Sequence, residues 1–158
     1  MRQRLNNTKN LITVRIVPKH KVRLRKQKNE YNKRPYAKMR KTLHNRMLKV
    51  LKNKNIKKTN GTIPLLGCRI NTFVEWMKFQ FDPYMTWENH GDYWHIDHCQ
   101  PCNSFDLLKT SEQKECFHWT NMQPMEGIEN ISKSDNYTSW DLLKQEIKVA
   151  AFKLQMGL

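Results

Sequence analysis

The chain has 158 residues and a hydrophobic content of 38%, which is enough for one compact domain with an extension. Its net charge of +15 is divided unevenly: residues 1–60 hold 21 Lys and Arg against one acid (+20), whereas residues 61–158 hold 8 against 13 (−5). No apolar run approaches the ~20 residues that span a bilayer, so we expect an intracellular protein, cytoplasmic or nuclear, that is not secreted and is not bound to a membrane.

Residues 1–35 are polar and basic, and we expect a flexible arm there, with a short strand over 11–17 as an alternative. Apolar residues then recur at three- and four-residue steps over 36–51, which predicts a basic helix, and 53–62 form a Lys/Asn-rich linker. A basic arm on an acidic body indicates a polyanionic partner, nucleic acid first, because neutralised phosphates release counterions. A solvated tail is the alternative interpretation.

The compact body starts near residue 65 and mixes helices with short strands, which indicates an α+β fold. Thr72 followed by Glu75 predicts a capping box that opens a helix reaching Phe81, and Pro83 is expected to end it. Strands are predicted over WHIDH at 94–98 and within CFHWTNMQPM at 116–125, with a short helix around 128–133. Ser139 is expected to cap a last helix with one apolar face, made of Leu143, Ile147, Ala150, Ala151 and Leu154.

The chemistry-bearing residues fall at the ends of these elements. Asp97 and His98 close the first strand, Asn121 comes 23 residues after His98, and Asn130 comes 9 residues later. The carboxylate of Asp97 and the amide oxygen of Asn130 are hard ligands that suit Mg²⁺ or Mn²⁺. His98 points to the opposite side of an extended strand, where it can act as general base near neutral pH. Asn121 can bond backbone groups across the loop and fix its geometry.

The segment from 66 to 135 closely resembles the HNH endonucleases of phages and large DNA viruses. The resemblance rests on LGC at 66–68, QF at 80–81, MTWENHG at 85–91, WHIDHCQPC at 94–102, and FHWTNMQPM with ENISKSD up to 135. It implies a ββα-metal (HNH) finger that hydrolyses phosphodiester bonds of double-stranded DNA, leaving a 5′-phosphate and a 3′-hydroxyl. It also implies that Asp97 is a metal ligand, that His98 is the general base and that Asn121 is the central Asn. The last position of the family, often His, is here Asn130.

Several further residues are candidates for binding phosphate groups or zinc. Lys133, three residues after Asn130, is a candidate phosphate contact, and the basic helix offers a DNA-backbone surface made of Arg40, Lys41, Arg46 and Lys49. CQPC at 99–102 looks like half a zinc site that Cys68 or Cys116 could complete. Since only one such pair is present, buried thiols are favoured and no structural Zn²⁺ is expected. His95 and His118 are interpreted as core or supporting residues.

Three interpretations of function remain open at this stage. The first is the metal-dependent endonuclease, a nickase of homing, packaging-associated or restriction-like role. The alternative is a non-enzymatic, basic nucleic-acid-binding protein that keeps an HNH-like scaffold. The third is a basic RNA- or ribosome-associated protein, which would need only the arm at 1–60. The complete set of Asp97, His98 and Asn130 favours the enzyme. A single site per chain favours nicking by a monomer, whereas a dimer could cut both strands.

Overall fold

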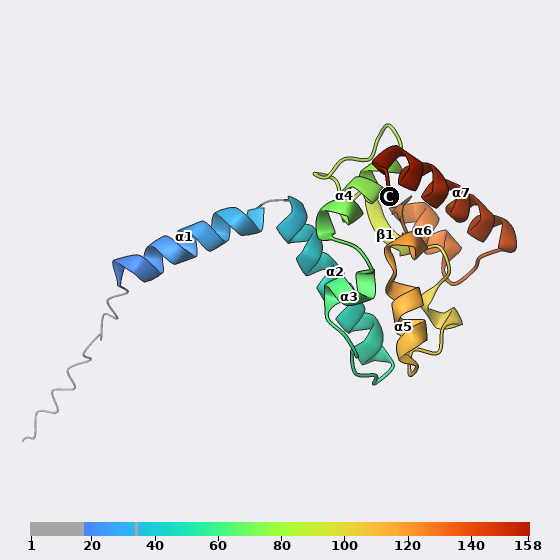
Figure 1. The fold of residues 1–158 in the computed structure, drawn as a ribbon, viewed down its shortest axis with the longest axis horizontal. Helices are drawn as coiled ribbons and strands as arrows, with labels where there is room; N and C mark the ends of the chain where they lie inside the picture. The colour runs from blue at the N-terminus through green and yellow to red at the C-terminus, as the bar shows by residue number, and fades with distance from the viewer. Residues whose placement is uncertain (1–17, 34) are drawn as a thin grey trace, which may run out of the picture.

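The computed structural model describes residues 18–33 and 35–158 (Figure 1). The strand considered over 11–17 lies outside these residues. The described part of the arm forms a helix, α1 (Lys19–Lys33), which the sequence pattern did not predict. Its side chains from 20 to 30 are all exposed, and Figure 1 shows it extending away from the body. Lys, Arg and Gln have good helix propensity, so a helix forms here without an apolar stripe.

The predicted basic helix is confirmed as α2 (Pro35–Asn53). Its apolar stripe is buried in the same core as the segments that follow residue 65, and consists of Met39, Leu43, Met47 and Leu51. Arg40, Lys41 and Lys49 lie exposed on its other side. The helix therefore packs on the body and presents a cationic face at the same time.

Two helices pack against α2. The short α3 (Thr62–Leu66) ends at Gly67, whose φ of 75° is left-handed and whose added Cβ would collide with the ring of His118. Helix α4 (Ile70–Phe79) begins after Arg69 with no side-chain cap, so the capping box expected at Thr72 is wrong. Thr72 lies inside the helix because the chain already turns helical at Ile70.

The sheet consists of β1 (Trp94–His98) and β2 (Met122–Glu126), paired antiparallel with Asp97 opposite Gln123. Helix α6 (Gly127–Lys133) follows β2 directly and packs on both strands, so the predicted order of strand, strand and helix is present. The second strand is shorter than predicted. Residues 116–121 belong instead to the end of α5 (Thr110–Phe117) and to a 3-10 turn, η2 (Trp119–Asn121), and a second such turn, η1, spans Cys102–Ser104.

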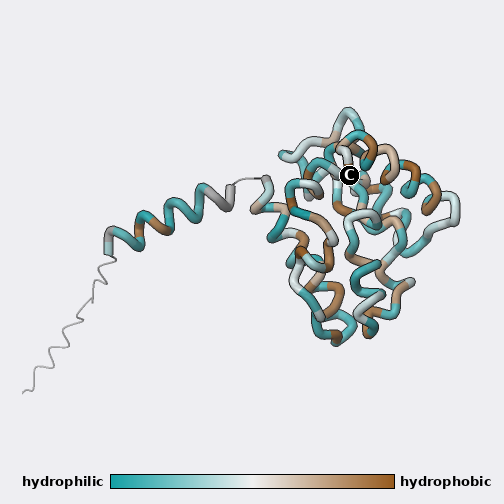
Figure 2. The backbone as a smooth tube through the Cα atoms, in the orientation of Figure 1, coloured by the Kyte–Doolittle hydropathy of each residue, from teal (hydrophilic) through white to brown (hydrophobic). Residues whose placement is uncertain are grey.

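The last helix, α7 (Ser139–Met156), is capped by Thr138, not Ser139, in a capping box with Asp141. The apolar face predicted for it is wrong. Gln145 and Phe152 are buried, whereas Leu143, Ile147 and Leu154 are 44%, 58% and 87% exposed. Figure 2 shows hydrophobic residues, in brown, recurring along this helix. Phe152 decides the orientation, because its ring packs on the core rings of Trp76 and Trp119 and on the more exposed ring of Phe79.

The architecture is a mixed α+β domain in which a two-stranded sheet lies among helices. Across the described ranges, no helix has the length and apolar character needed to cross a membrane.

Candidate functional site

Asp97 lies near the end of β1 and faces α6. Its Oδ2 accepts a hydrogen bond from Gln123 Nε2 at 3.1 Å and lies 3.2 Å from Lys133 Nζ. The Asp97 and Lys133 side chains are only 11% and 14% exposed, so the two charges are largely desolvated. A carboxylate held in this way has a fixed orientation and lies close to the surface.

Helix α6 brings a second predicted residue to the same face. Asn130 and Lys133 are three residues apart, hence on one side of a helix. Lys133 reaches Asp97, while the Asn130 Nδ2 lies 3.4 Å from Nδ1 of His95. His95 and Asp97 are two positions apart on β1 and therefore share a face of the strand. The structure thus gathers Asp97, Asn130 and Lys133 on one side of the strand–strand–helix unit.

The donor set on this face fits a hard divalent cation. The recorded contacts of the Asp97 carboxylate both use Oδ2, and the Asn130 contact uses its amide nitrogen. One carboxylate oxygen and one amide oxygen are therefore not engaged in these contacts. Mg²⁺ is commonly held by one or two such oxygens with several retained waters. In this structure the Lys133 ammonium group compensates the charge of Asp97.

The sequence predicts that His95 is a core or supporting residue. In the structure its side chain lies directly beside that of Asn130. Its Nε2 lies 3.0 Å from the carbonyl oxygen of Gly91, which orients the ring, while Nδ1 faces Asn130. The signal that could have singled it out is the two-residue period of the strand, which puts His95 beside Asp97. An imidazole at this place can join or orient a metal ligand set.

His98 points to the opposite face of β1, as the alternation of the strand predicts. Its ring is 6% exposed and lies 6.0 Å from the ring of Phe117. Its backbone carbonyl accepts a bond from Lys133 Nζ at 3.0 Å. Its Nε2 is buried and, among the described residues, has no hydrogen-bond partner. The imidazole is therefore enclosed, and only the backbone carbonyl of His98 contacts the Asp97 face, through Lys133.

Two cysteines lie beside His98. Cys116 Sγ donates to Cys102 Sγ at 3.4 Å, which lowers the pKa of Cys102 and raises that of Cys116. Burial acts to raise the pKa of both thiols. His98 and the positive charge of Arg46 act to lower the pKa of Cys102, whereas the charge of Lys54 only partly opposes the rise in the pKa of Cys116. The pair of cysteines in CQPC does not converge, since Cys99 Sγ instead contacts the carbonyl oxygen of Asp141 at 3.5 Å.

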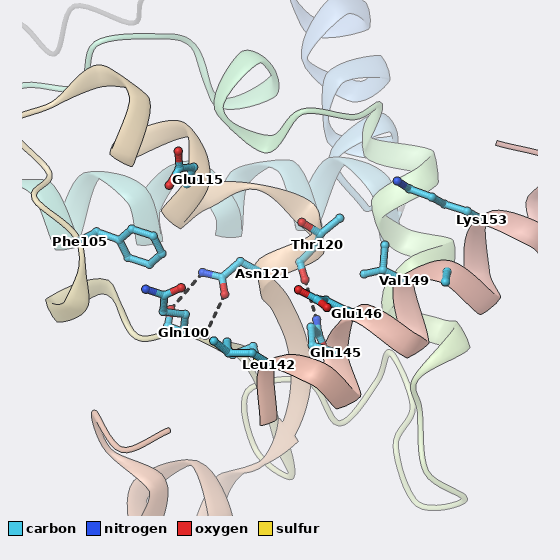
Figure 3. A pocket seen from close by; sticks show the side chains of 12 residues that line it. Gln100, Phe105, Glu115, Thr120, Asn121, Leu142, Gln145, Glu146, Val149 and Lys153 are labelled. Atoms are coloured by element: carbon cyan, nitrogen blue, oxygen red, sulfur yellow. Dashed lines mark hydrogen bonds between the residues drawn. The ribbon is translucent and has the colours of Figure 1, made fainter. Parts of the chain in front are cut away.

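Asn121 braces the loop after β1, as its side chain predicted. Its Oδ1 accepts from the Gln100 backbone N–H at 2.8 Å, and its Nδ2 donates to the carbonyls of Gln100 and Cys116 at 3.0 Å each. Figure 3 shows this amide beside a hollow of about 500 Å³ against α7. The hollow lies on the side of the brace and is not lined by Asp97 or Asn130, so the brace and the Asp97 face are separate features.

Cationic side chains flank the Asp97 face on two sides. A hollow of about 510 Å³ is lined by Lys133, Lys144 and Lys148, together with Gln123, which bonds Asp97. Lys144 and Lys148 were not predicted as binding residues, because the net negative charge of residues 61–158 hides a local cluster of lysines. They are four residues apart on α7, and that spacing on one helix face was the available signal.

The other side is formed by α2. Arg46 is half-buried; burial lowers its pKa, and nearby Cys102 and Asp97 oppose that shift. Lys41 lines a further hollow of about 420 Å³ between α2 and the 87–90 loop, together with His90. Burial lowers the pKa of His90, and the charges of His95 and Arg46 add to the effect. Of the predicted α2 cations, Arg46 lies near Asp97, while Arg40, Lys41 and Lys49 are exposed on the helix.

Comparisons with known proteins place this sequence near viral proteins. It is 43% identical over 145 residues to an uncharacterized protein, L246, of Acanthamoeba polyphaga mimivirus, covering 92% of this chain and 60% of the relative. It is also 43% identical over 133 residues to uncharacterized protein L426 of the same virus, covering 84% of this chain and 58% of the relative. The chain therefore spans about 60% of the length of these relatives. No protein-family model matches the sequence, and no solved structure matches it.

Proposed function

We propose that this protein is a metal-dependent DNA endonuclease of the HNH type. The observation that carries the proposal is the grouping of Asp97, Asn130 and Lys133 on one face of a strand–strand–helix unit, with His98 directly after Asp97. Oxygen ligands for a divalent cation and a nearby lysine are groups that can support phosphodiester hydrolysis. The products would be a 5′-phosphate and a 3′-hydroxyl.

Asp97 and Asn130 would hold Mg²⁺ or Mn²⁺, and His95 orients Asn130. A cation bound there would polarise the scissile phosphate and stabilise charge on the leaving 3′-oxygen. Lys133, which pairs with Asp97 in the structure, would then be free to contact a phosphate oxygen.

His98 takes the proton from the attacking water. Its Nε2 has no partner within the described part of the chain and is therefore available as a proton acceptor. The imidazole is enclosed, so the loop that follows β1 has to open when DNA binds. The Asn121 brace holds that loop at Gln100 and Cys116, which limits the movement to the segment between them.

Double-stranded DNA is the proposed partner. The exposed cations of α2 and the lysines beside Asp97 are the side chains that would contact its phosphates. These contacts bind phosphates and carry no base readout, which leaves binding largely independent of sequence and sensitive to salt.

The experiment is cleavage of supercoiled plasmid with Mg²⁺, Mn²⁺, Zn²⁺ or EDTA, followed by mapping of the ends. His98→Ala should abolish Mg²⁺-dependent cutting while Mg²⁺ still raises the melting temperature, because His98 is base and not ligand. Asp97→Asn should lose both the cutting and the Mg²⁺ effect. His44→Ala, an exposed histidine of α2, is the matched control and should cut like the wild type. Cutting that survives in EDTA or in Asp97→Asn would contradict the proposal.

The second candidate is a nucleic-acid-binding protein without catalysis. The enclosed His98 and the Lys133–Asp97 ion pair favour it, since a site in this state is closed. Wild-type protein that shifts DNA in a gel yet leaves plasmid intact with every cation would support this function.

A further inference from the structure

A second side-chain cluster lies on the face of β1 opposite Asp97. It consists of His98, Cys102 and Cys116, which offer one nitrogen and two sulfur atoms all within 4.8 Å of one another. The two sulfurs are 3.4 Å apart. His98 and Cys116 are buried and Cys102 is half-buried, so the cluster is nearly closed to solvent.

These distances are close to those of a tetrahedral metal centre. Zn–S bonds of about 2.3 Å and Zn–N bonds of about 2.0 Å place two ligand sulfurs roughly 3.8 Å apart and a nitrogen roughly 3.5 Å from each sulfur. The cluster therefore needs shifts of about an ångström, within the reach of side-chain rotation at Cys102. Two thiolates and an imidazole are the ligands that select zinc and other soft transition metals over Mg²⁺.

An independent observation also indicates a ligand at this place. The Nε2 of His98 is buried and has no hydrogen-bond partner among the residues that the structure describes, which is costly unless something binds it. Two thiolates also neutralise a divalent ion, so burial of the complex carries no net charge.

We propose that His98, Cys102 and Cys116 form a second metal site, which binds Zn²⁺ and leaves one coordination position open. The site is separate from the oxygen ligands on the Asp97 face, since the two sets lie on opposite sides of one strand. Zn²⁺ held there occupies His98 and so inhibits Mg²⁺-dependent DNA cutting. This inhibition rests on the proposed nuclease function, whereas the metal site itself does not.

The test is a titration of the full chain, kept reduced, with Co²⁺ as a spectroscopic substitute for Zn²⁺. We expect a thiolate-to-cobalt absorption band in the near ultraviolet that Zn²⁺ bleaches and excess Mg²⁺ does not. Cys102→Ser and Cys116→Ser should each weaken Co²⁺ binding by more than ~100-fold, a larger loss than outer-shell changes cause. Cys68→Ser and Cys99→Ser are the matched controls and should keep the band.

A measurement on the wild type covers the case in which a variant does not fold. Zn²⁺ should protect Cys102 and Cys116 from alkylation, as read by mass spectrometry of the peptides, and should leave Cys68 unprotected. A missing band, a band that persists when both Cys102 and Cys116 are replaced, or isolation of this pair as a disulfide that Zn²⁺ does not prevent would overturn the proposal. If the band forms but wild-type protein cuts no DNA with any cation, the nuclease function fails and the metal site stands.

Discussion

The ion pair between Lys133 and Asp97 can be tested by removing its cation. Lys133→Met keeps most of the apolar stem and removes the charge that lies 3.2 Å from Asp97 Oδ2. At an effective dielectric constant of about 20, two unit charges at that distance attract with roughly 5 kcal/mol before desolvation is subtracted. Breaking a buried pair from one side typically costs about 3–5 kcal/mol, because the remaining charge is uncompensated.

We expect a loss near the lower end of that range, about 3 kcal/mol, because both side chains retain some contact with water. For a chain of this size that corresponds to a fall in Tm of roughly 6–12 °C. Mg²⁺ should restore part of the loss in Lys133→Met, since the cation takes the place of the ammonium group beside Asp97. Differential scanning calorimetry with Mg²⁺ and with EDTA measures both effects.

The double variant Lys133→Met with Asp97→Asn is the matched control. It carries no uncompensated charge, so it should be more stable than Lys133→Met alone and should not respond to Mg²⁺. The reasoning is refuted if Lys133→Met melts like the wild type, or if the two substitutions simply add.

Three further predictions follow from the site. Asn121→Asp places a carboxylate against two backbone carbonyls and should lower both the Tm and the cutting activity. Asn130→Asp keeps an oxygen ligand and should reduce mainly the cutting activity. A Tm of Asn121→Asp equal to that of the wild type would contradict this. Deletion of residues 1–35 removes 12 Lys and Arg and should weaken DNA binding, with a shallower salt dependence by fluorescence anisotropy; equal affinity at every salt concentration would exclude the arm as a DNA contact. Lys144→Ala and Lys148→Ala should each reduce the magnitude of that salt slope by about 1, and an unchanged slope would place DNA elsewhere.

Local patterns explain which parts of the site were predictable. The alternation of WHIDH predicted both the strand and the opposite orientations of Asp97 and His98, because a strand reverses its side chains at each residue. The backbone bonds of Asn121 followed from the ability of an amide to donate and accept across a loop. Helix α5 was missed because its eight residues are too few to display a helical period.

By itself, the sequence determined the basic helix at α2, the strand that carries Asp97, and the short helix that carries Asn130, since each depends on periodicity or spacing within a few residues. Only the tertiary structure decided that α7 buries Phe152 and leaves Leu143 and Ile147 exposed. It alone also brought Cys116, and not Cys99, next to Cys102. These outcomes depend on which large side chain fills the core and on contacts between segments far apart in the chain, and neither is encoded in the local pattern of any one segment.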